Sequence, residues 1–217
     1  MSDNCDFLVR FWGVRGSISI SDPNSVRYGG NTSCLEIRCG ERLLIFDAGS
    51  GFRYLGNKLL ETDGAIDADI FLTHTHYDHI CGIPFFKPFF DPNNRFRLSA
   101  GHLLPETTLR NVLCDMMMTP LFPVPLEIFQ SKIEFRDFTA GDALNAGADV
   151  VIRTTPLNHP DNATGYRIEF ADKSICYLTD TEHLVGELDQ NILRLIDGAD
   201  IVIYDSMYTE DEYKNCV

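Results

Sequence analysis

Four metal-capable side chains within a run of six residues constrain this chain more than any other feature of its sequence. They are His74, His76, Asp78 and His79, and they follow an apolar segment, 68–72, that is typical of a β-strand. Side chains alternate along an extended chain, so His74 and His76 are expected on the same side. A turn then brings Asp78 and His79 back to a position beside His74 and His76. Such a set suits two adjacent divalent ions, and a solvated histidine-rich loop is the weaker alternative.

The spacing of these residues resembles the H-x-H-x-D-H signature of the metallo-β-lactamase superfamily. Three N-terminal segments extend the resemblance: 11–17 (FWGVRGS), 28–34 (YGGNTSC) and 46–51 (FDAGSG). They are similar to the branch of phosphodiesterase-like hydrolases related to cyclic-phosphate phosphodiesterases and tRNA 3′-end nucleases. The resemblance covers nearly the whole chain. It implies an α/β fold, an α+β sandwich of four αββα layers in which two β-sheets pack face to face with helices outside.

The resemblance also implies two further ligands. Family members carry a third histidine after a later strand, where this chain has His159, and a metal-bridging aspartate after another, where it has Asp180. The first ion would be held by His74, His76 and His159, and the second by Asp78, His79 and the bridging Asp180. Zinc is the expected ion, although these ligands also suit manganese and iron. Taken alone, His159 would be a loop histidine and Asp180 a turn or helix N-cap residue.

One family ligand has no counterpart here. Related enzymes usually place another histidine after the last strand, where it completes the second metal site, but segment 205–217 contains none. Either the sequence is truncated or the second site is incomplete, and we expect weakened occupancy of that site. His183 is a substitute ligand because it is close to Asp180 in sequence. A surface position, or a contact to another ligand, is the more ordinary role for it.

Three aspartates and His183 are candidates for roles around the metals. Asp78 is expected to orient the attacking water while it acts as a ligand. Asp205 and His183 are candidate proton donors to a leaving alkoxide, and the alternative for Asp205 is a helix N-cap. Asp47 is either a partner of a metal-bound histidine or a turn residue. His102 has no companion motif, which predicts a structural role.

The glycine-rich segments offer weaker candidates. Asn31 and Thr32 follow Gly29 and Gly30 and could present donors to a phosphate, and Arg15 could clamp one. No strand-to-helix context supports a dinucleotide or P-loop fingerprint. A plain structural loop is therefore the favoured interpretation of these segments.

The composition fits one enzyme domain spanning residues 1–217. Hydrophobic residues make up 44% of the chain and charged residues 23%, which is ordinary for a globular protein. No apolar run is long enough to cross a bilayer, and the acidic start lacks the features of a secretory signal. The seven cysteines are odd in number and contain no C-x-x-C pair, so we expect reduced thiols in a cytoplasmic protein.

The net charge of −14 argues against an extensive nucleic-acid interface, which depends on clustered lysine and arginine. A small anionic phosphodiester remains compatible with this charge, because two divalent ions make a site locally positive. No membrane partner is expected. A homodimer is an open alternative, because these folds often pair.

The pattern of apolar residues alternates between strand-like and helical segments. We expect strands at 8–12, 34–39, 42–46, 70–73, 133–138, 149–155, 165–170, 174–179 and 200–204. We expect helices at 52–60, 105–118 and 184–196, and a loop at 120–125, where three prolines fall in six residues.

These features predict a metal-dependent hydrolase. The leading hypothesis is a phosphodiesterase that cleaves a cyclic nucleotide or cyclic sugar phosphate through a metal-activated hydroxide. A tRNA 3′-end ribonuclease is the alternative, with the acidic charge and the lack of an evident basic docking arm against it. Thioester or lactone hydrolysis, and a non-catalytic metal- or nucleotide-binding protein, also stay open.

Overall fold

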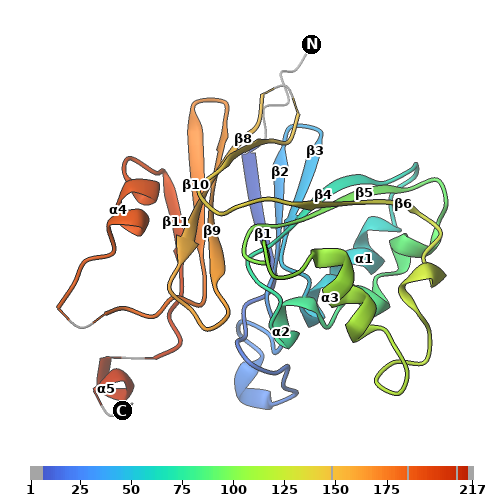
Figure 1. Cartoon of the computed structure of the whole chain (residues 1–217), viewed down its shortest axis with the longest axis horizontal. Coiled ribbons are helices and arrows are strands. Elements are labelled where there is room, and N and C mark those ends of the chain that lie inside the picture. The colour runs from blue at the N-terminus through green and yellow to red at the C-terminus, as the bar shows by residue number, and fades with distance from the viewer. Residues whose placement is uncertain (1–6, 148, 185, 209, 215–217) are drawn as a thin grey trace.

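The computed structural model describes residues 7–147, 149–184, 186–208 and 210–214 (Figure 1). Two mixed β-sheets pack face to face, and helices cover their outer faces. The fold expected from the sequence is thereby confirmed.

The first sheet has six strands in sequence order. They are β1 (Phe7–Gly13), β2 (Cys34–Cys39), β3 (Arg42–Phe46), β4 (Asp67–Leu72), β5 (Arg95–Ala100) and β6 (Lys132–Asp137). The pairs from β1 to β3 are antiparallel, and Gly40, with φ of 57°, provides the hairpin turn between β2 and β3. From β3 to β6 the pairing is parallel, so these four strands end at the same edge of the sheet.

The second sheet has five strands in the order β11-β10-β9-β8-β7. They are β7 (Ala143–Asn145), β8 (Val151–Leu157), β9 (Ala163–Phe170), β10 (Lys173–Leu178) and β11 (Ile201–Tyr204). Antiparallel pairing from β7 to β10 and parallel pairing of β10 with β11 place the carboxyl ends of β8, β10 and β11 at one edge. The loops that follow these three strands therefore lie next to one another.

Five α-helices occur in the described ranges: α1 (Ser50–Leu59), α2 (Tyr77–Ile80), α3 (Leu109–Met116), α4 (Gln190–Ile196) and α5 (Glu210–Tyr213). Helix α1 packs against β1 and β2, and α3 packs against β5 and β6. Helix α4 covers β8 and β9 on the far side of the second sheet (Figure 1). The short 3-10 helices lie at Pro23–Ser25, Ile83–Phe85, Lys87–Phe90 and Leu126–Ile128.

Aromatic side chains fill the core on both sides of the first sheet. Between the sheets, the Phe46 ring lies 5.3 Å from Phe71 and 5.2 Å from Tyr166, measured between centroids. Behind the first sheet, Phe52 stacks on Phe86 at 3.8 Å. The four phenylalanines at 85–90 divide by exposure: Phe86 and Phe89 are buried, whereas Phe85 and Phe90 are exposed.

The main differences from the expected elements concern two strands and the starts of two helices. Strands β5 and β7 were not predicted. Helix α3 begins at Leu109, since Thr108 acts as its N-cap and Asp137 accepts a hydrogen bond from the Leu109 amide. Helix α4 begins at Gln190, since the Asp189 side chain accepts from two amides of the first turn.

Two global features complete the description. No helix among the described residues is both long and apolar enough to span a membrane. All five cysteines in the described ranges are free thiols.

Candidate metal centre at the carboxyl ends of the strands

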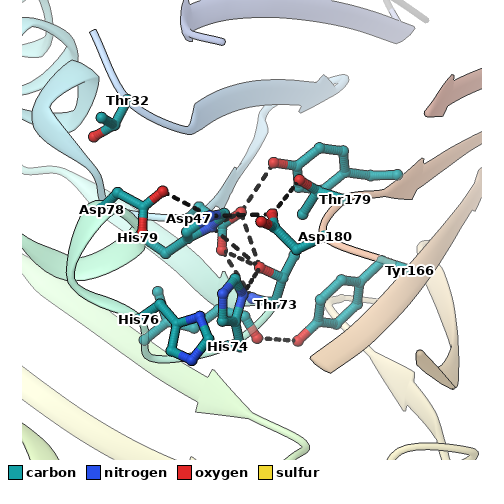
Figure 2. Close-up of polar contacts among 12 residues, drawn as sticks. Thr32, Asp47, Thr73, His74, His76, Asp78, His79, Tyr166, Thr179 and Asp180 are labelled. Carbon is teal, nitrogen blue, oxygen red and sulfur yellow. Dashed lines mark hydrogen bonds and ion pairs between the residues drawn. The ribbon is translucent and has the colours of Figure 1, made fainter. Parts of the chain in front are cut away.

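Histidines and aspartates from both sheets converge where the carboxyl ends of the strands meet. His74 and His76 follow β4, and His79 lies in α2 immediately beyond them. His159 follows β8, and Asp180 follows β10. The parallel strands of the first sheet and the aligned strand ends of the second sheet thus bring together residues that are distant in sequence. Figure 2 shows part of this cluster, with Thr73 among the histidines and aspartates.

Three imidazoles form the first group of donors. One ring nitrogen from each of His74, His76 and His159 lies within 4.8 Å of the others. The Nε2 atom of His159 is 3.1 Å from Nδ1 of His76. His74 is buried, and its Nε2 atom has no hydrogen-bond partner in the described structure. A buried ring nitrogen without a partner is costly, and a cation in this group would satisfy it.

The second group combines imidazole and carboxylate. His74, His79 and Asp180 offer ligand atoms within 4.8 Å of one another. The Nε2 atom of His79 is 3.2 Å from Oδ2 of Asp180 and 3.6 Å from Oδ2 of Asp78. All six residues predicted as ligands therefore lie at one place, and His74 belongs to both groups.

Asp47, which follows β3, anchors the second group from inside the protein. Its carboxylate accepts hydrogen bonds from the Thr73 amide at 2.8 Å and from the Tyr177 hydroxyl at 2.9 Å. Its Oδ2 atom is 3.0 Å from Nδ1 of His79. An acidic partner on Nδ1 leaves Nε2 of His79 directed at Asp180, which is the arrangement that orients a metal-binding histidine. Of the two roles expected for Asp47, the structure favours the histidine partner over the simple turn residue.

Burial and neighbouring charges shift the pKa values of the two buried histidines, His74 and His79, in opposite directions. Burial, together with the neighbouring His79, lowers the pKa of His74 to about 2, so this ring is neutral and able to bind a cation. Burial also acts to lower the pKa of His79, but the carboxylates of Asp47 and Asp180 outweigh it and raise that pKa to about 10. Burial acts to raise the pKa of Asp180, and its hydrogen bond with His79 holds the pKa well below the ordinary value. Without a cation in the site, the two carboxylates therefore favour the protonated form of the His79 ring.

The described residues fit a pair of divalent ions on chemical grounds. The unpartnered nitrogen of His74 lacks a donor or acceptor, and three imidazoles are a ligand set that zinc prefers. In the second group, a cation would replace the proton on His79, because metal ligands bind in their deprotonated form.

Backbone contacts fix the loops that carry these ligands. The Tyr166 hydroxyl donates to the Leu72 carbonyl at 2.6 Å, and the Thr164 amide donates to the Thr73 carbonyl at 2.8 Å. Both bonds join the second sheet to the loop that carries His74. On the opposite side, Asn158 and Glu182 exchange two hydrogen bonds of 2.7 and 2.9 Å. This exchange ties the His159 loop to the Asp180 loop.

A loop from the N-terminal part of the chain reaches Asp78. The Ser17 amide donates to Oδ2 of Asp78 at 2.7 Å, and Ser17 adopts a φ of 65° to do so. A hydrogen bond from a backbone amide to a carboxylate is charge-assisted, so it restrains the orientation of this group. The sequence contained no signal for this contact, because Ser17 is 61 residues away from Asp78.

The two predicted proton donors, His183 and Asp205, make their side-chain contacts outside the cluster. The His183 ring stacks on Tyr204, with its Nε2 atom 2.9 Å from the tyrosine hydroxyl. The carboxylate of Asp205 accepts a hydrogen bond from the Met207 amide, which is a local turn contact. Neither residue belongs to the two donor groups found among the described residues. Their catalytic roles stay predictions.

Asn31 and Thr32 are largely engaged within the fold. Thr32 is buried and exchanges hydrogen bonds with Ser50, whose amide donates to the Thr32 hydroxyl at 2.8 Å. The Asn31 side chain contacts Ser50 and the Trp12 carbonyl. These bonds tie the N-terminal loop to the start of α1, in line with the structural alternative. Arg15 is exposed, and its contact with substrate stays a prediction.

A model of the beta-lactamase superfamily domain matches residues 42–215, and the chain therefore belongs to this family. The resemblance suggested by the histidine motif is confirmed. At the level of sequence, ribonuclease Z of Haloarcula marismortui is 28% identical over 169 residues, which are 76% of this chain and 48% of that protein.

Two further proteins are similar to this chain, one in sequence and one in fold. Ribonuclease BN of Cronobacter sakazakii is 27% identical over 151 residues, covering 60% of this chain and 40% of that protein. The chain thus spans less than half the length of these two relatives. The crystal structure of the short form of human tRNase Z superposes with a TM-score of 0.65 at 17% identity, covering 95% of this chain and 81% of that one. This last likeness concerns the fold alone.

Proposed function

We propose that this chain is a metal-dependent phosphodiesterase whose substrate is the 3′ region of an RNA. The observation that carries the proposal is the convergence of four other histidine and aspartate donors, His76, His79, His159 and Asp180, around the unpartnered nitrogen of His74. The names of the relatives, ribonuclease Z and ribonuclease BN, support RNA as the substrate over the cyclic nucleotide that the sequence first favoured.

Each group of donors has a distinct part in the proposed reaction. His74, His76 and His159 would hold one ion, and Asp78, His79 and Asp180 a second. Two ions at such a site supply an activated water and neutralise charge that develops on the phosphoryl oxygens. Asp47 would keep Nε2 of His79 directed into the site by holding Nδ1. Asp78, restrained by the Ser17 amide, would orient the attacking water.

The charge of the protein limits the form of the RNA contact. A net charge of −14 opposes binding along a long phosphate backbone. The proposal therefore confines recognition to the few nucleotides around the scissile bond, where the ions offset the negative charge. The same observation keeps a compact cyclic nucleotide as a second candidate substrate.

The test is a hydrolysis panel with zinc or manganese added. It includes a precursor tRNA with a 3′ trailer, a short single-stranded RNA, and 2′,3′- and 3′,5′-cyclic nucleotides. His76→Ala serves as the control, because it removes one imidazole of the first group. We expect cleavage of the precursor tRNA that is lost in the control.

Other outcomes assign other functions. Turnover of cyclic nucleotides alone would replace the RNA substrate by the second candidate. Binding of a nucleotide without its consumption would identify a non-catalytic binding protein. No turnover on the panel by metal-loaded protein would reject phosphodiester hydrolysis and lead to thioester and lactone substrates.

A further inference from the structure

His102 occupies the loop next to the histidine motif, although nothing in its sequence context indicated a role. Strands β4 and β5 are parallel, and Leu72 pairs with Ala100 at their carboxyl ends. The segment after β4, which carries His74 and His76, and the segment after β5, which carries His102, therefore leave the sheet side by side.

A side-chain hydrogen bond joins the two segments. The Thr75 Oγ1 atom lies 3.1 Å from Nε2 of His102. His102 is 9% exposed, and its Nδ1 atom is buried without a hydrogen-bond partner. A buried donor without an acceptor is rarer in proteins than an under-satisfied acceptor. The favoured tautomer therefore carries its proton on Nε2 and donates it to the Thr75 hydroxyl.

The backbone around His102 leaves little room for movement. A Cβ atom at Gly101 would lie 2.4 Å from the Phe138 ring and 3.0 Å from Oγ1 of Thr164. Close contact on both sides holds this segment in place, so His102 is a fixed point from which Thr75 can be restrained.

Thr75 is the residue between His74 and His76. Those two side chains need a common orientation to share one ion, and the peptide units on either side of Thr75 set their directions. A hydrogen bond that fixes the Thr75 side chain restricts rotation of these peptide units. Residues that orient ligands in this way affect metal affinity by about 10- to 100-fold.

We propose that His102 is a positioning residue of the first ion site and acts through the Thr75 hydroxyl. The inference rests on the proposed function only in requiring that His74, His76 and His159 bind a cation. It assigns His102 no contact with substrate or ion. It adds the loop after β5 to the segments that define the metal centre.

The test measures zinc affinity by competition with a chromogenic chelator, without substrate. Thr75→Val removes the hydroxyl and keeps the shape, and His102→Leu removes the donor. We expect each substitution to weaken zinc binding at the first site about tenfold. The double variant should bind zinc no more weakly than either single variant, because both remove the same bond. Thr75→Ser, which keeps a hydroxyl, should retain most of the affinity.

The controls separate positioning from general damage. Thr139→Val makes the same chemical change at an exposed residue after β6 and should leave zinc affinity unchanged. If His102→Leu fails to fold, Thr75→Val and Thr75→Ser still test whether the Thr75 hydroxyl supports zinc binding. Unchanged affinity in Thr75→Val, or additive losses in the double variant, would overturn the inference. Absence of zinc binding by the unmodified protein would reject the metal centre itself, and the role of His102 with it.

Discussion

Asp47 is a buried carboxylate in an uncommon backbone conformation. It has a φ of 60°, in the left-handed region, and is fully buried. Asparagine and aspartate tolerate this region better than other non-glycine residues, yet it still costs free energy. The donors around the carboxylate, from Thr73, Tyr177 and His79, offset that cost. A conformation of this kind persists where the surrounding contacts over-determine it.

The substitution Asp47→Asn should show how much depends on this group. The asparagine NH2 group, itself a donor, would replace a carboxylate oxygen that now accepts from neighbouring donors. Buried polar atoms would be left without partners, and we expect the free energy of unfolding to fall by about 3 kcal/mol. Zinc occupancy of the second site should also fall, because His79 loses its acidic partner. Urea denaturation and zinc stoichiometry measure the two effects. Asp115→Asn, on an exposed position of α3, is the matched control. Equal stability of the two variants would contradict the role of Asp47.

At this scale the sequence predicted the donors and offered Asp47 as a histidine partner, but it did not predict the other residues that hold the donors in place. The histidine motif has a short, fixed spacing, so periodicity alone brings its side chains together. Tyr177 lies 130 residues from Asp47, and Thr75 lies 27 residues from His102. Such pairs depend on how strands are ordered in a sheet, and a single sequence carries no local signal for that order.

Strand β5 illustrates why an element can be missed. Its sequence, RFRLSA, includes two arginines, and charged residues are usually exposed. In the structure, Arg97 is buried and binds Asp69 and Asp67 of β4. Asp69, also buried, binds Arg42 of β3 as well. The network satisfies the charges of adjacent parallel strands at their amino-terminal edge, away from the metal centre.

Arg97→Met should therefore be strongly destabilising. Asp69 would remain buried with one arginine partner fewer, and we expect a loss of about 3 kcal/mol in urea denaturation. Arg95→Met removes an exposed arginine of the same strand, whose nearest carboxylate is 4.0 Å away, and should change stability by less than about 0.5 kcal/mol. Similar losses in both variants would contradict the importance of the buried network.

Arg97→Met should also change how the free energy of unfolding falls at acid pH. Partial burial acts to raise the pKa of Asp67, but its hydrogen bond to Arg97 and the nearby arginines lower it below the ordinary value. A carboxyl with a lower pKa in the folded state contributes stability above its unfolded pKa of about 3.9, and that contribution is lost as the pH falls. Stability should decline less steeply below about pH 4 in Arg97→Met. The contribution is small because Asp67 is half exposed.

The approach of α2 to the loop after β3 depends on a glycine. A Cβ atom at Gly82 would lie 2.1 Å from the Gly49 carbonyl oxygen and 2.8 Å from that of Ala48. Its φ of −79° is ordinary, so the requirement is purely one of space. The Ala48 amide also donates to the His79 carbonyl at 2.8 Å, which links this contact to the metal centre.

Gly82→Ala should force these two segments apart. Because backbone atoms cannot move aside as a side chain can, we expect a loss of about 3 kcal/mol in stability, at the upper end for overpacking. Thermal unfolding followed by circular dichroism measures it. Gly16→Ala is the control, since its Cβ would meet only the flexible end of Met207. A Gly82→Ala protein as stable as this control would show that the segments can separate without cost.

At the scale of the whole molecule, the two donor groups predict different affinities for zinc. The first contains three imidazoles, whereas the second combines His79 with carboxylates and shares His74. We expect a tight step and a weaker step in a zinc titration. His76→Ala should abolish the tight step, and Asp78→Ala the weak one. Two ions bound with equal affinity would contradict this prediction. Zinc at 100 times its dissociation constant should add about 2.7 kcal/mol of stability.

The convergence of ligands from both sheets has a mechanical consequence. A bound ion would connect 74–79 of the first sheet with 159–180 of the second, and so cross-link positions separated by about 80 residues of intervening chain. Removing the ion would remove this cross-link, while the core between the sheets and the hydrogen bonds of Tyr166 and Tyr177 would still hold the two halves together. Chelation would therefore loosen the ligand loops at 74–79 and 159–180, which open locally, and leave the aromatic core of Phe46, Phe71 and Tyr166 closed.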